Sequence, residues 1–312
     1  MAVLAIGVLS FSLCAALSTA EGIRGAGQDN PAQQRYTSVS EQTLPLPVDG
    51  IFRLTNYHGD ITVAGTNGRM VLIRAIREVE AQERSVAQAL LTALSFTVAG
   101  GDTAVEVVTR LPEAAVVREI TGSDPESTRL RISYVVEVPA DVRISVRSTS
   151  GSIVIHDVDR TVDLDTMSGN MTVRNAGGPV VAGSASGDID LTDIGRRIRA
   201  TCVSGDITIR GDVPADVEAN NTGGSIRWNG RVGEGGLIRL SSHSGDIEFT
   251  ALGETGFSVN LSTISGSIST PLALVLTGET TSRRSLQGEY LEPVARVELT
   301  AFSGNITLIT RP

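Results

Sequence analysis

The sequence predicts a mainly β protein: a single-stack β-solenoid, or β-helix-like repeat array, with a small N-terminal α+β cap that contains one helix. Two observations predict this class. The first is a short motif in which a glycine precedes Ser, Asp or Asn and then an apolar residue; its first seven copies in the array are 18 to 21 residues apart. Such a period is typical of a solenoid. The eight glycines of the array are Gly151, Gly169, Gly187, Gly205, Gly224, Gly245, Gly266 and Gly304.

The second observation is that apolar and polar residues alternate on both sides of each glycine. Around Gly205 the apolar residues are Ile198 and Ala200 before it and Ile207 and Ile209 after it. A period of two indicates a strand with one buried face, so each unit predicts a strand, a Ser-Gly turn and a second strand. One unit cannot bury its apolar face alone. We therefore expect the units to stack, about 4.8 Å per coil, into a rod about 40 Å long.

The glycine is expected at the corner of each coil, where the backbone needs a positive φ or a bulge. The Ser, Asp or Asn after it suits a turn that hydrogen-bonds its own backbone. A ninth copy lies earlier in the chain, so Gly59 joins the eight as a structural turn glycine.

Four segments are expected along the chain. Residues 1–20 predict a signal peptide, because the apolar run Val3–Leu17 is short and small residues follow it; an uncleaved anchor is the alternative. Residues 21–49 are rich in Gln, Ser, Gly and Pro and predict a linker or flexible arm. Residues 50–140 predict the α+β cap. Residues 141–312 predict the repeat array, with a loop or degenerate coil at 277–292.

Within the cap, apolar residues at helical spacing predict one amphipathic helix over Glu78–Leu94, and Arg118–Arg129 predict a polar loop. We expect the helix to cover the open strand edge of the first coil, since exposed edges invite aggregation. At the other end, the copy at Gly304 is expected to close the array.

Composition narrows the function classes. The chain has 312 residues, 41% of them hydrophobic, and a net charge of -9. It should therefore fold, and its charge disfavours nucleic acid as a partner. Aromatic residues make up 4%, which predicts a narrow aliphatic core without an obvious stacking platform for sugars. No segment after the signal peptide is long and apolar enough to cross a membrane.

These motifs resemble those of the bacterial putative-adhesin family, a domain of unknown function. The resemblance rests on the repeated Ser-Gly-Asp-Ile pattern, the early copy at Tyr57–Ile61, the single helix near residue 85 and the entry to the array at Val138–Val142. It covers roughly residues 50–310. It implies an exported or envelope-associated β-solenoid, and it brings no catalytic or binding residues with it.

The residue after the turn glycine is the strongest polar signal, and it is Asp in four copies, at Asp60, Asp188, Asp206 and Asp246. Turn hydrogen bonding is the favoured interpretation, because Ser or Asn takes this place in the other copies. A cation site is the weaker hypothesis: Asp188 and Asp206 fall in consecutive coils and could hold Ca²⁺, and Asp246 is a further candidate. No other cofactor is expected.

Catalysis is a third hypothesis for the same face. Parallel β-helix enzymes that cut acidic polysaccharides place Asp clusters and an Arg on one exposed sheet. Here Asp190, Arg210 and Arg227 point outward by periodicity beside Asp188 and Asp206. Charges that alternate on a solvated face explain them equally well, so no catalytic residue is assigned.

The remaining candidates are weaker. Removal of the signal peptide takes Cys14 away and leaves Cys202 alone, so no intramolecular disulfide is expected. Cys202 is interpreted as a small residue of a packed inner column and not as a reactive thiol. The three histidines, His58, His156 and His243, are too scattered for a metal site.

The sequence thus predicts a non-enzymatic protein of the periplasm, cell surface or extracellular space, which presents a regular face to an unknown envelope glycan or protein. A polysaccharide-active enzyme that uses Asp188, Asp206 and Asp246 is one alternative. An extracytoplasmic regulatory partner of a membrane signalling system is the other.

Overall fold

The computed structural model describes residues 34–122, 128–213, 216–277, 282 and 284–312. The predicted signal peptide, Cys14 and residues 21–33 of the predicted linker lie outside the described residues. Among the described residues, neither helix has the length and apolar character needed to span a membrane.

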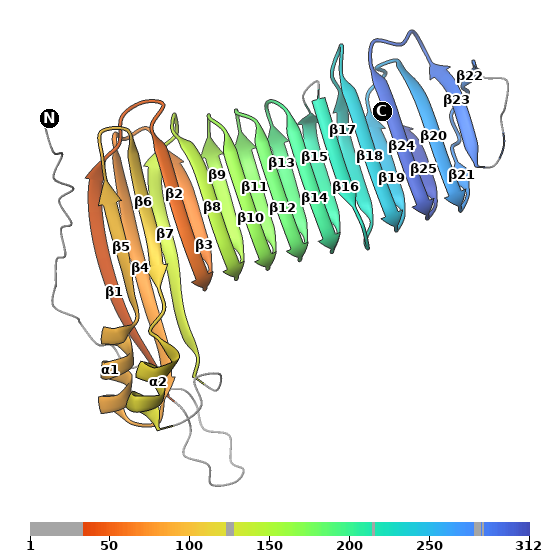
Figure 1. Cartoon of the computed structure of the whole chain (residues 1–312). Helices are drawn as coiled ribbons and strands as arrows, with labels where there is room; N and C mark the ends of the chain where they lie inside the picture. Colours follow the sequence, from red (N-terminus) through yellow and green to blue (C-terminus); the bar gives the residue numbers. More distant parts are fainter. Residues whose placement is uncertain (1–33, 123–127, 214–215, 278–281, 283) are drawn as a thin grey trace, which may run out of the picture.

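Two sheets face each other along a rod, which confirms the predicted mainly β solenoid (Figure 1). Each coil gives one strand to a 13-stranded sheet B, turns at its Ser-Gly motif, and gives the next strand to a 12-stranded sheet A. The sheet B strands of the coils are β2 (Ile51–His58), β8 (Arg143–Ser150), β10 (Val162–Ser168), β12 (Val180–Ser186), β14 (Ile198–Ser204), β16 (Asp216–Asn221), β18 (Leu237–Ser244), β20 (Phe257–Ser265) and β24 (Arg296–Ser303). Their sheet A partners are β3 (Ile61–Thr66), β9 (Ile153–Val158), β11 (Met171–Ala176), β13 (Ile189–Ile194), β15 (Ile207–Val213), β17 (Ile226–Val232), β19 (Ile247–Leu252), β21 (Ile268–Ser269) and β25 (Ile306–Arg311).

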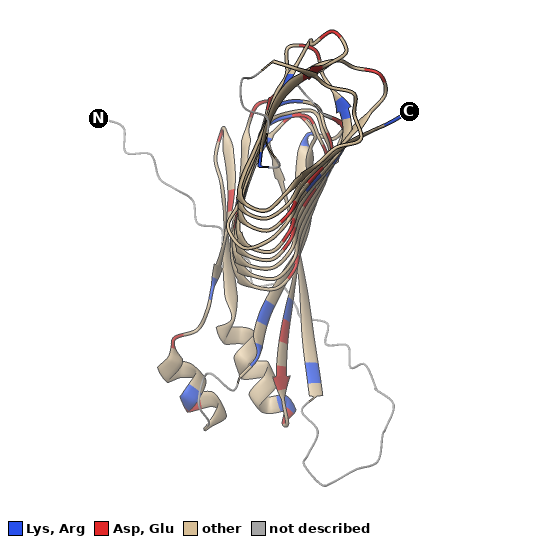
Figure 2. Cartoon of the chain, turned by 90° about the vertical axis from the view of Figure 1, so that its right-hand side faces the viewer, with Lys and Arg blue, Asp and Glu red and all other residues tan. Residues whose placement is uncertain are grey.

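Equivalent residues of neighbouring coils lie side by side in register. Val162 pairs with Val180 in sheet B, and Ile189 pairs with Ile207 in sheet A. All four side chains are buried between the sheets, where the repeated apolar columns form one continuous core. Seen along the rod, the coils superimpose as a stack of similar loops (Figure 2).

The early copy of the motif belongs to the same rod. β2 pairs with β8 and β3 pairs with β9, so the coil of Gly59 stacks directly on the coil of Gly151. The residues between these two coils in the chain leave the rod and extend both sheets beyond the first coil. The segment predicted as a separate cap is therefore continuous with the solenoid.

The order of the last coils differs from the order of the chain. β24 lies between β18 and β20, and β25 lies between β19 and β21. The expectation that the copy at Gly304 closes the array is thus wrong: the coil of Gly266 lies beyond it. Val297 and Leu299 are in register with both neighbouring strands, because every coil carries the same apolar pattern. β23 (Ser285–Tyr290), which lies within the predicted loop, and β22 (Val275–Leu276), which precedes it, continue sheet B with antiparallel pairing.

At the N-terminal end, sheet A continues through β7 (Leu130–Pro139), β4 (Met70–Ala81) and β1 (Gln34–Pro45), and sheet B continues through β6 (Ala104–Arg110) and β5 (Ser95–Gly100). The prediction of a linker over 21–49 is wrong for β1, which pairs with β4 residue for residue from Gln34 to Pro45. Its polar residues do not prevent this, since backbone hydrogen bonds to β4 hold an edge strand.

The described residues contain two helices where one was predicted: α1 (Arg84–Ala93) and α2 (Ala114–Thr121). α1 starts later than expected because β4 continues to Ala81, and α2 begins ahead of the predicted polar loop. We call the free ends of the long strands (residues 34–39, 76–81 and 130–133), together with the two helices, the foot; it projects from the rod (Figure 1). α1 packs on β4 and β1 and does not cover the edge of the first coil.

Candidate functional site

The turn glycines form a row along one rim of the rod. φ lies between 113° and 159° in six of the nine, namely Gly59, Gly151, Gly169, Gly187, Gly205 and Gly245. A Cβ on Gly169 would overlap the carbonyl oxygen of Gly151 in the neighbouring coil, and every turn glycine meets the adjacent backbone in the same way. The row therefore needs glycine for close contact between coils as well as for its dihedral angles.

The Asp residues after the glycines link neighbouring coils. The Oδ1 atoms of Asp60, Asp188, Asp206 and Asp246 accept backbone N–H groups from Ser152, Asp206, Ser225 and Asn305, at 2.9, 2.9, 2.9 and 2.7 Å. Asn170 accepts the N–H of Asp188 at 2.9 Å in the same manner. The sequence had suggested a hydrogen bond within the residue's own turn. In the structure the bond instead reaches the next coil. It needs an acceptor and no charge, which explains why Asn replaces Asp.

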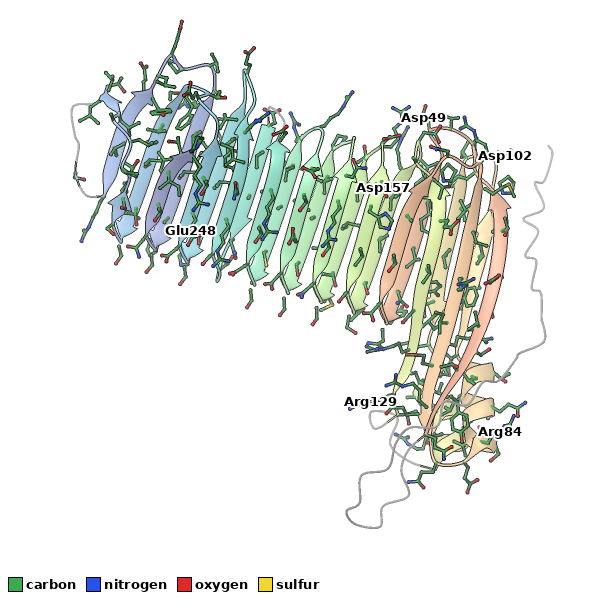
Figure 3. The ribbon with its side chains drawn as sticks, turned by 180° about the vertical axis from the view of Figure 1, so that it is seen from behind. Asp49, Arg84, Asp102, Arg129, Asp157 and Glu248 are labelled. Atoms are coloured by element: carbon green, nitrogen blue, oxygen red, sulfur yellow. The ribbon has the colours of Figure 1, made fainter. Side chains whose placement is uncertain are left out.

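The outward carboxylates of sheet A are paired with arginine. Asp206 Oδ2 lies 2.8 Å from Arg227, and Asp190 Oδ2 lies 2.8 Å from Arg210. The N–H of Ser225 and then Arg227 lower the pKa of Asp206, against the opposing effect of burial. A general acid at neutral pH needs a raised pKa, so this carboxyl is held in the wrong protonation state for that role. Acidic residues recur along this flank (Figure 2), and Glu248 marks its outer surface (Figure 3).

The three cation candidates do not form a cluster in the structure. Asp188 and Asp206 are in adjacent coils, whereas the coil of Gly224 separates Asp206 from Asp246. Among the described residues, no group of three or more His, Cys, Asp or Glu side chains is close enough to hold a metal ion.

The outer face of sheet B has a different character. Six residues before the turn glycine, its charges pair with each other between coils: Arg199 contacts Glu218 and Arg239 contacts Glu298, both at 2.9 Å. Nearer the turns, the face is uncharged over the last five coils. This stretch contains a shallow depression of about 220 Å³, which we call the C-terminal groove. It is lined by Thr201, Asn220, Asn221, Thr222, Ser241, Ser242, His243, Ile264, Thr300, Ala301 and Phe302.

Hydroxyl groups form one side of the C-terminal groove. Thr201, Ser241 and Thr300 stand four residues before their turn glycines, one in each of β14, β18 and β24. In the part of the chain that the structure describes, their hydroxyl groups have no hydrogen-bond partner. Asn220 adds an amide to the same column, with a long 3.4 Å contact to Glu218.

Three side chains, His243, Phe302 and Ile264, give the other side its apolar character, and each stands two residues before its turn glycine. The rings of His243 and Phe302 stack with centroids 4.7 Å apart and planes 15° from parallel. Ile264 follows in the next coil, and the exposed fractions of Phe302 and Ile264 are 48% and 59%. We call His243, Phe302 and Ile264 the apolar strip. The low aromatic content had predicted no stacking platform. The sequence does not reveal this pair, because His243 and Phe302 lie 59 positions apart and only the order of the coils brings them together.

A second cavity lies where the foot meets the row of turns. Its volume is about 520 Å³, and its apolar wall includes Leu111 and Val117. Arg35 and Arg129 each lie 3.9 Å from Glu80 at its rim. Figure 3 shows Arg129 on the side of the foot that faces the rod.

The remaining sequence candidates lie apart from both cavities or at their margin. Cys202 is buried, its Sγ is 3.4 Å from the carbonyl oxygen of Gly187, and burial raises the pKa of the thiol. His58 Nδ1 lies 2.8 Å from Ser150 Oγ at the foot cavity, and His156 Nδ1 lies 2.7 Å from Asp157.

Comparison with known protein families finds one whose sequence model matches most of the chain. The sequence model of a family described as Toastrack DUF4097 matches residues 52–227 and again residues 134–309, and together these matches span both the early copy and the whole array. A comparison with curated proteins finds no match.

Solved structures similar to this chain share little sequence identity with it. One is a putative adhesin from Bacteroides fragilis, with 13% identity over 88% of this chain and 97% of that chain and a TM-score of 0.43. Another is a putative cell adhesion protein from Clostridium sporogenes, with 9% identity over 88% and 100% and a TM-score of 0.30. A third is a putative lipid binding protein from Parabacteroides distasonis, with 10% identity over 85% and 96% and a TM-score of 0.37.

Proposed function

The chain belongs to the Toastrack DUF4097 family, and from this premise we propose that it is a non-enzymatic, exported cell-envelope protein whose solenoid presents a binding face to a glycan or a protein. The family match confirms the resemblance drawn from the Ser-Gly-Asp-Ile repeat. We assign the binding face to the outer surface of sheet B at the C-terminal groove.

One observation supports this choice of face above the others. In the C-terminal groove, hydroxyl groups without protein partners lie beside an exposed apolar strip. Binding sites commonly combine apolar contact area with a few polar groups that fix orientation. The outer surface of sheet A lacks this combination, because its most prominent polar groups hold neighbouring coils together through hydrogen bonds and ion pairs.

The same contacts favour a non-enzymatic role. Asp206 binds a backbone N–H through one oxygen and Arg227 through the other, and both contacts favour its ionised form. Asp190 is likewise bound to Arg210. We also propose that the protein works without a bound metal. Its melting temperature is then expected to stay unchanged when calcium is added, whereas a native-state site would raise it.

Export is proposed from the N-terminal segment. The apolar run Val3–Leu17 and the small residues that follow it fit a signal peptide. An envelope location would also suit a chain whose 26 basic residues are outnumbered by 35 acidic ones, since a net charge of -9 disfavours nucleic acid.

Two assays on the pure protein test this function. In the first, the protein is sedimented with envelope particles from its source bacterium; wild type and an Asp206→Ala variant are both expected to be retained. In the second, defined acidic and neutral polysaccharides are incubated with both proteins, and no product is expected. Product formed by wild type and lost in the variant would replace the binding function with an enzymatic one. Failure of wild type to sediment with the envelope would remove the binding function.

A further inference from the structure

We propose that the C-terminal groove binds an uncharged polysaccharide chain that lies along the rod, across the strands of sheet B. This inference rests on the proposed function and adds the chemical class of the ligand. Three properties of the groove lead to it: its lack of net charge, its pairing of hydroxyl groups with an apolar strip, and its position in the middle of a sheet.

Charge is the first property. The groove is lined by uncharged residues and one histidine. The charged column beside it is neutral overall, because Arg199 pairs with Glu218 and Arg239 pairs with Glu298 across neighbouring coils. An acidic polysaccharide or an anionic headgroup would find no free cation here. An uncharged ligand needs no opposite charge in the groove, and it suffers no repulsion from a charge of the same sign.

Polarity is the second property. A sugar presents C–H patches on its ring faces and hydroxyl groups at its edges. The apolar strip of His243, Phe302 and Ile264 offers contact area for the former. The hydroxyl groups of Ser241 and Thr300, which have no partner in the described chain, offer both donors and acceptors for the latter. The C–H groups of a sugar also carry a partial positive charge, which is attracted to the negative face of an aromatic ring such as that of Phe302.

Position is the third property, and it argues against a peptide. β18 is hydrogen-bonded to β16 and β24, and β24 is hydrogen-bonded to β18 and β20. An extended peptide gains much of its affinity by adding a strand to an open edge, and the groove offers no such edge. The ligand must be recognised through side chains alone.

The length of the groove along the rod follows from the spacing between coils. The groove crosses five strands, from Thr201 on β14 to Ile264 on β20. Four steps of about 4.8 Å give about 19 Å. A hydroxyl or amide side chain recurs on four of the five strands, so successive sugars of one chain meet similar polar groups; these residues are Thr201, Asn220, Ser241 and Thr300.

The test uses envelope material divided into two probes. One portion is digested with protease, which leaves the polysaccharide; the other is oxidised with periodate, which cleaves vicinal diols of sugars and leaves protein. Wild type is expected to sediment with the protease-treated particles and to lose this retention after periodate oxidation. Retention is also expected to persist in 0.5 M salt, because no ion pairs are formed with the ligand.

Variants assign the retention to the groove. Phe302→Ala is expected to weaken binding to the protease-treated particles about tenfold, as expected for the loss of one aromatic contact. Thr300→Asp, which places a charge in the hydroxyl column without touching the core, is expected to weaken it at least as much. Met167→Ala is the matched control, because Met167 is 65% exposed and, like Phe302, stands two residues before its turn glycine but does not line the groove; it should bind as wild type does. Thermal melting confirms that each variant is folded.

Three results would overturn the inference. Retention that resists periodate and disappears after protease treatment would indicate a protein partner at the same face and leave the proposed function intact. Retention that falls steeply in 0.5 M salt would indicate a charged ligand. Polysaccharide binding that is unchanged in folded Phe302→Ala and Thr300→Asp proteins would place the site elsewhere.

Discussion

At the scale of single residues, the repeat is held by contacts between coils that no isolated unit contains. The turn glycine lies against the carbonyl oxygen of the glycine in the coil on one side, and the Asp or Asn after it accepts a backbone N–H from the coil on the other side. Both contacts repeat down the rim, so the motif Ser-Gly-Asp-Ile describes an interface as much as a turn. Its aspartates are structural because the bond requires only an oxygen acceptor.

Gly169→Ala tests the close approach. Gly169 has a φ of 133°, and a Cβ there would overlap the carbonyl oxygen of Gly151. We expect the free energy of unfolding to fall by about 2 kcal/mol or more, since both backbone strain and displacement of a neighbouring coil contribute. Gly101→Ala is the control, because the nearest atom to its Cβ would be 3.8 Å away. Urea denaturation measures both; equal stabilities would contradict the account of the rim.

Asp206→Asn tests the acceptor and its pH dependence. The folded-state pKa of Asp206 is lowered, so its carboxylate adds stability above the unfolded pKa of about 3.9, and this stability is lost as pH falls through the folded value. The melting temperature of wild type should therefore fall more steeply below about pH 4 than that of the variant, which keeps an Oδ1 acceptor for Ser225. Asp206→Ala, which lacks the acceptor, should be less stable than both at pH 7. Parallel melting curves for wild type and Asp206→Asn would show that the charge adds nothing.

At the scale of elements, the foot shows how the solenoid ends. The strands β1, β4 and β7 outgrow the first coil, and α1 covers their inner face with Ala87, Leu90 and Leu91. Arg77 on β4 fixes this arrangement. Its guanidinium donates to the carbonyl oxygens of Leu91 and Leu94, at 3.0 and 3.4 Å, and to Ser38 and Ser40 on β1. A cation at the C-terminal end of a helix is favourable for the helix dipole as well.

Arg77→Ala is therefore expected to release α1 from the sheet. Loss of these bonds should cost the local structure about 1 to 2 kcal/mol, and amide hydrogen exchange over residues 84–93 should rise about tenfold. Exchange in β10 to β13 should stay unchanged. Arg84→Ala is the control, because Arg84 is exposed at the start of the same helix (Figure 3). Uniform acceleration across the rod would show that Arg77 supports the whole molecule and not the foot.

Several elements could be predicted from the sequence because their signals are local. The alternation of apolar and polar residues around Gly205 predicted both strands of its coil. The positive φ of the turn glycine and the stacking of the coils were predicted from the same repeat. β1 was missed because its paired residues on β4 lie 25 to 47 positions away and its own residues are mostly polar. The continuation of β4 through Val79 to Ala81 was mistaken for a helix, since a few apolar residues fit both periods.

At the scale of the whole molecule, the decisive feature is the place of the last coil. Identical apolar columns allow any coil to stack on any other, so the pattern fixes the shape of a coil and leaves the order of coils undetermined. The structure inserts β24 and β25 between earlier strands. This order stacks Phe302 on His243 and brings Thr300 beside Ser241, and thus creates the C-terminal groove. A site built in this way cannot be read from the residues of one repeat.

Paired cysteines test the coil order. Thr300 lies directly opposite Ser241 on one side and Ser262 on the other. Adjacent strands bring such residues to a Cα separation of about 4.8 Å, within disulfide range. In a Cys202→Ser background, Ser241→Cys with Thr300→Cys and Ser262→Cys with Thr300→Cys should each form a disulfide that mass spectrometry detects. A disulfide between Ser241→Cys and Ser262→Cys would instead support coils stacked in the order of the chain.

The central claim is that sheet B, and not sheet A, carries the binding face. It is tested most directly by placing the same new charge on each face and measuring retention on envelope particles. Ser241→Asp adds the charge in the C-terminal groove, and Thr208→Asp adds it on the outer face of sheet A, beside Asp190 and Arg227. We predict that Ser241→Asp loses most of the retention and that Thr208→Asp keeps it. Loss with Thr208→Asp and full retention with Ser241→Asp would contradict the account.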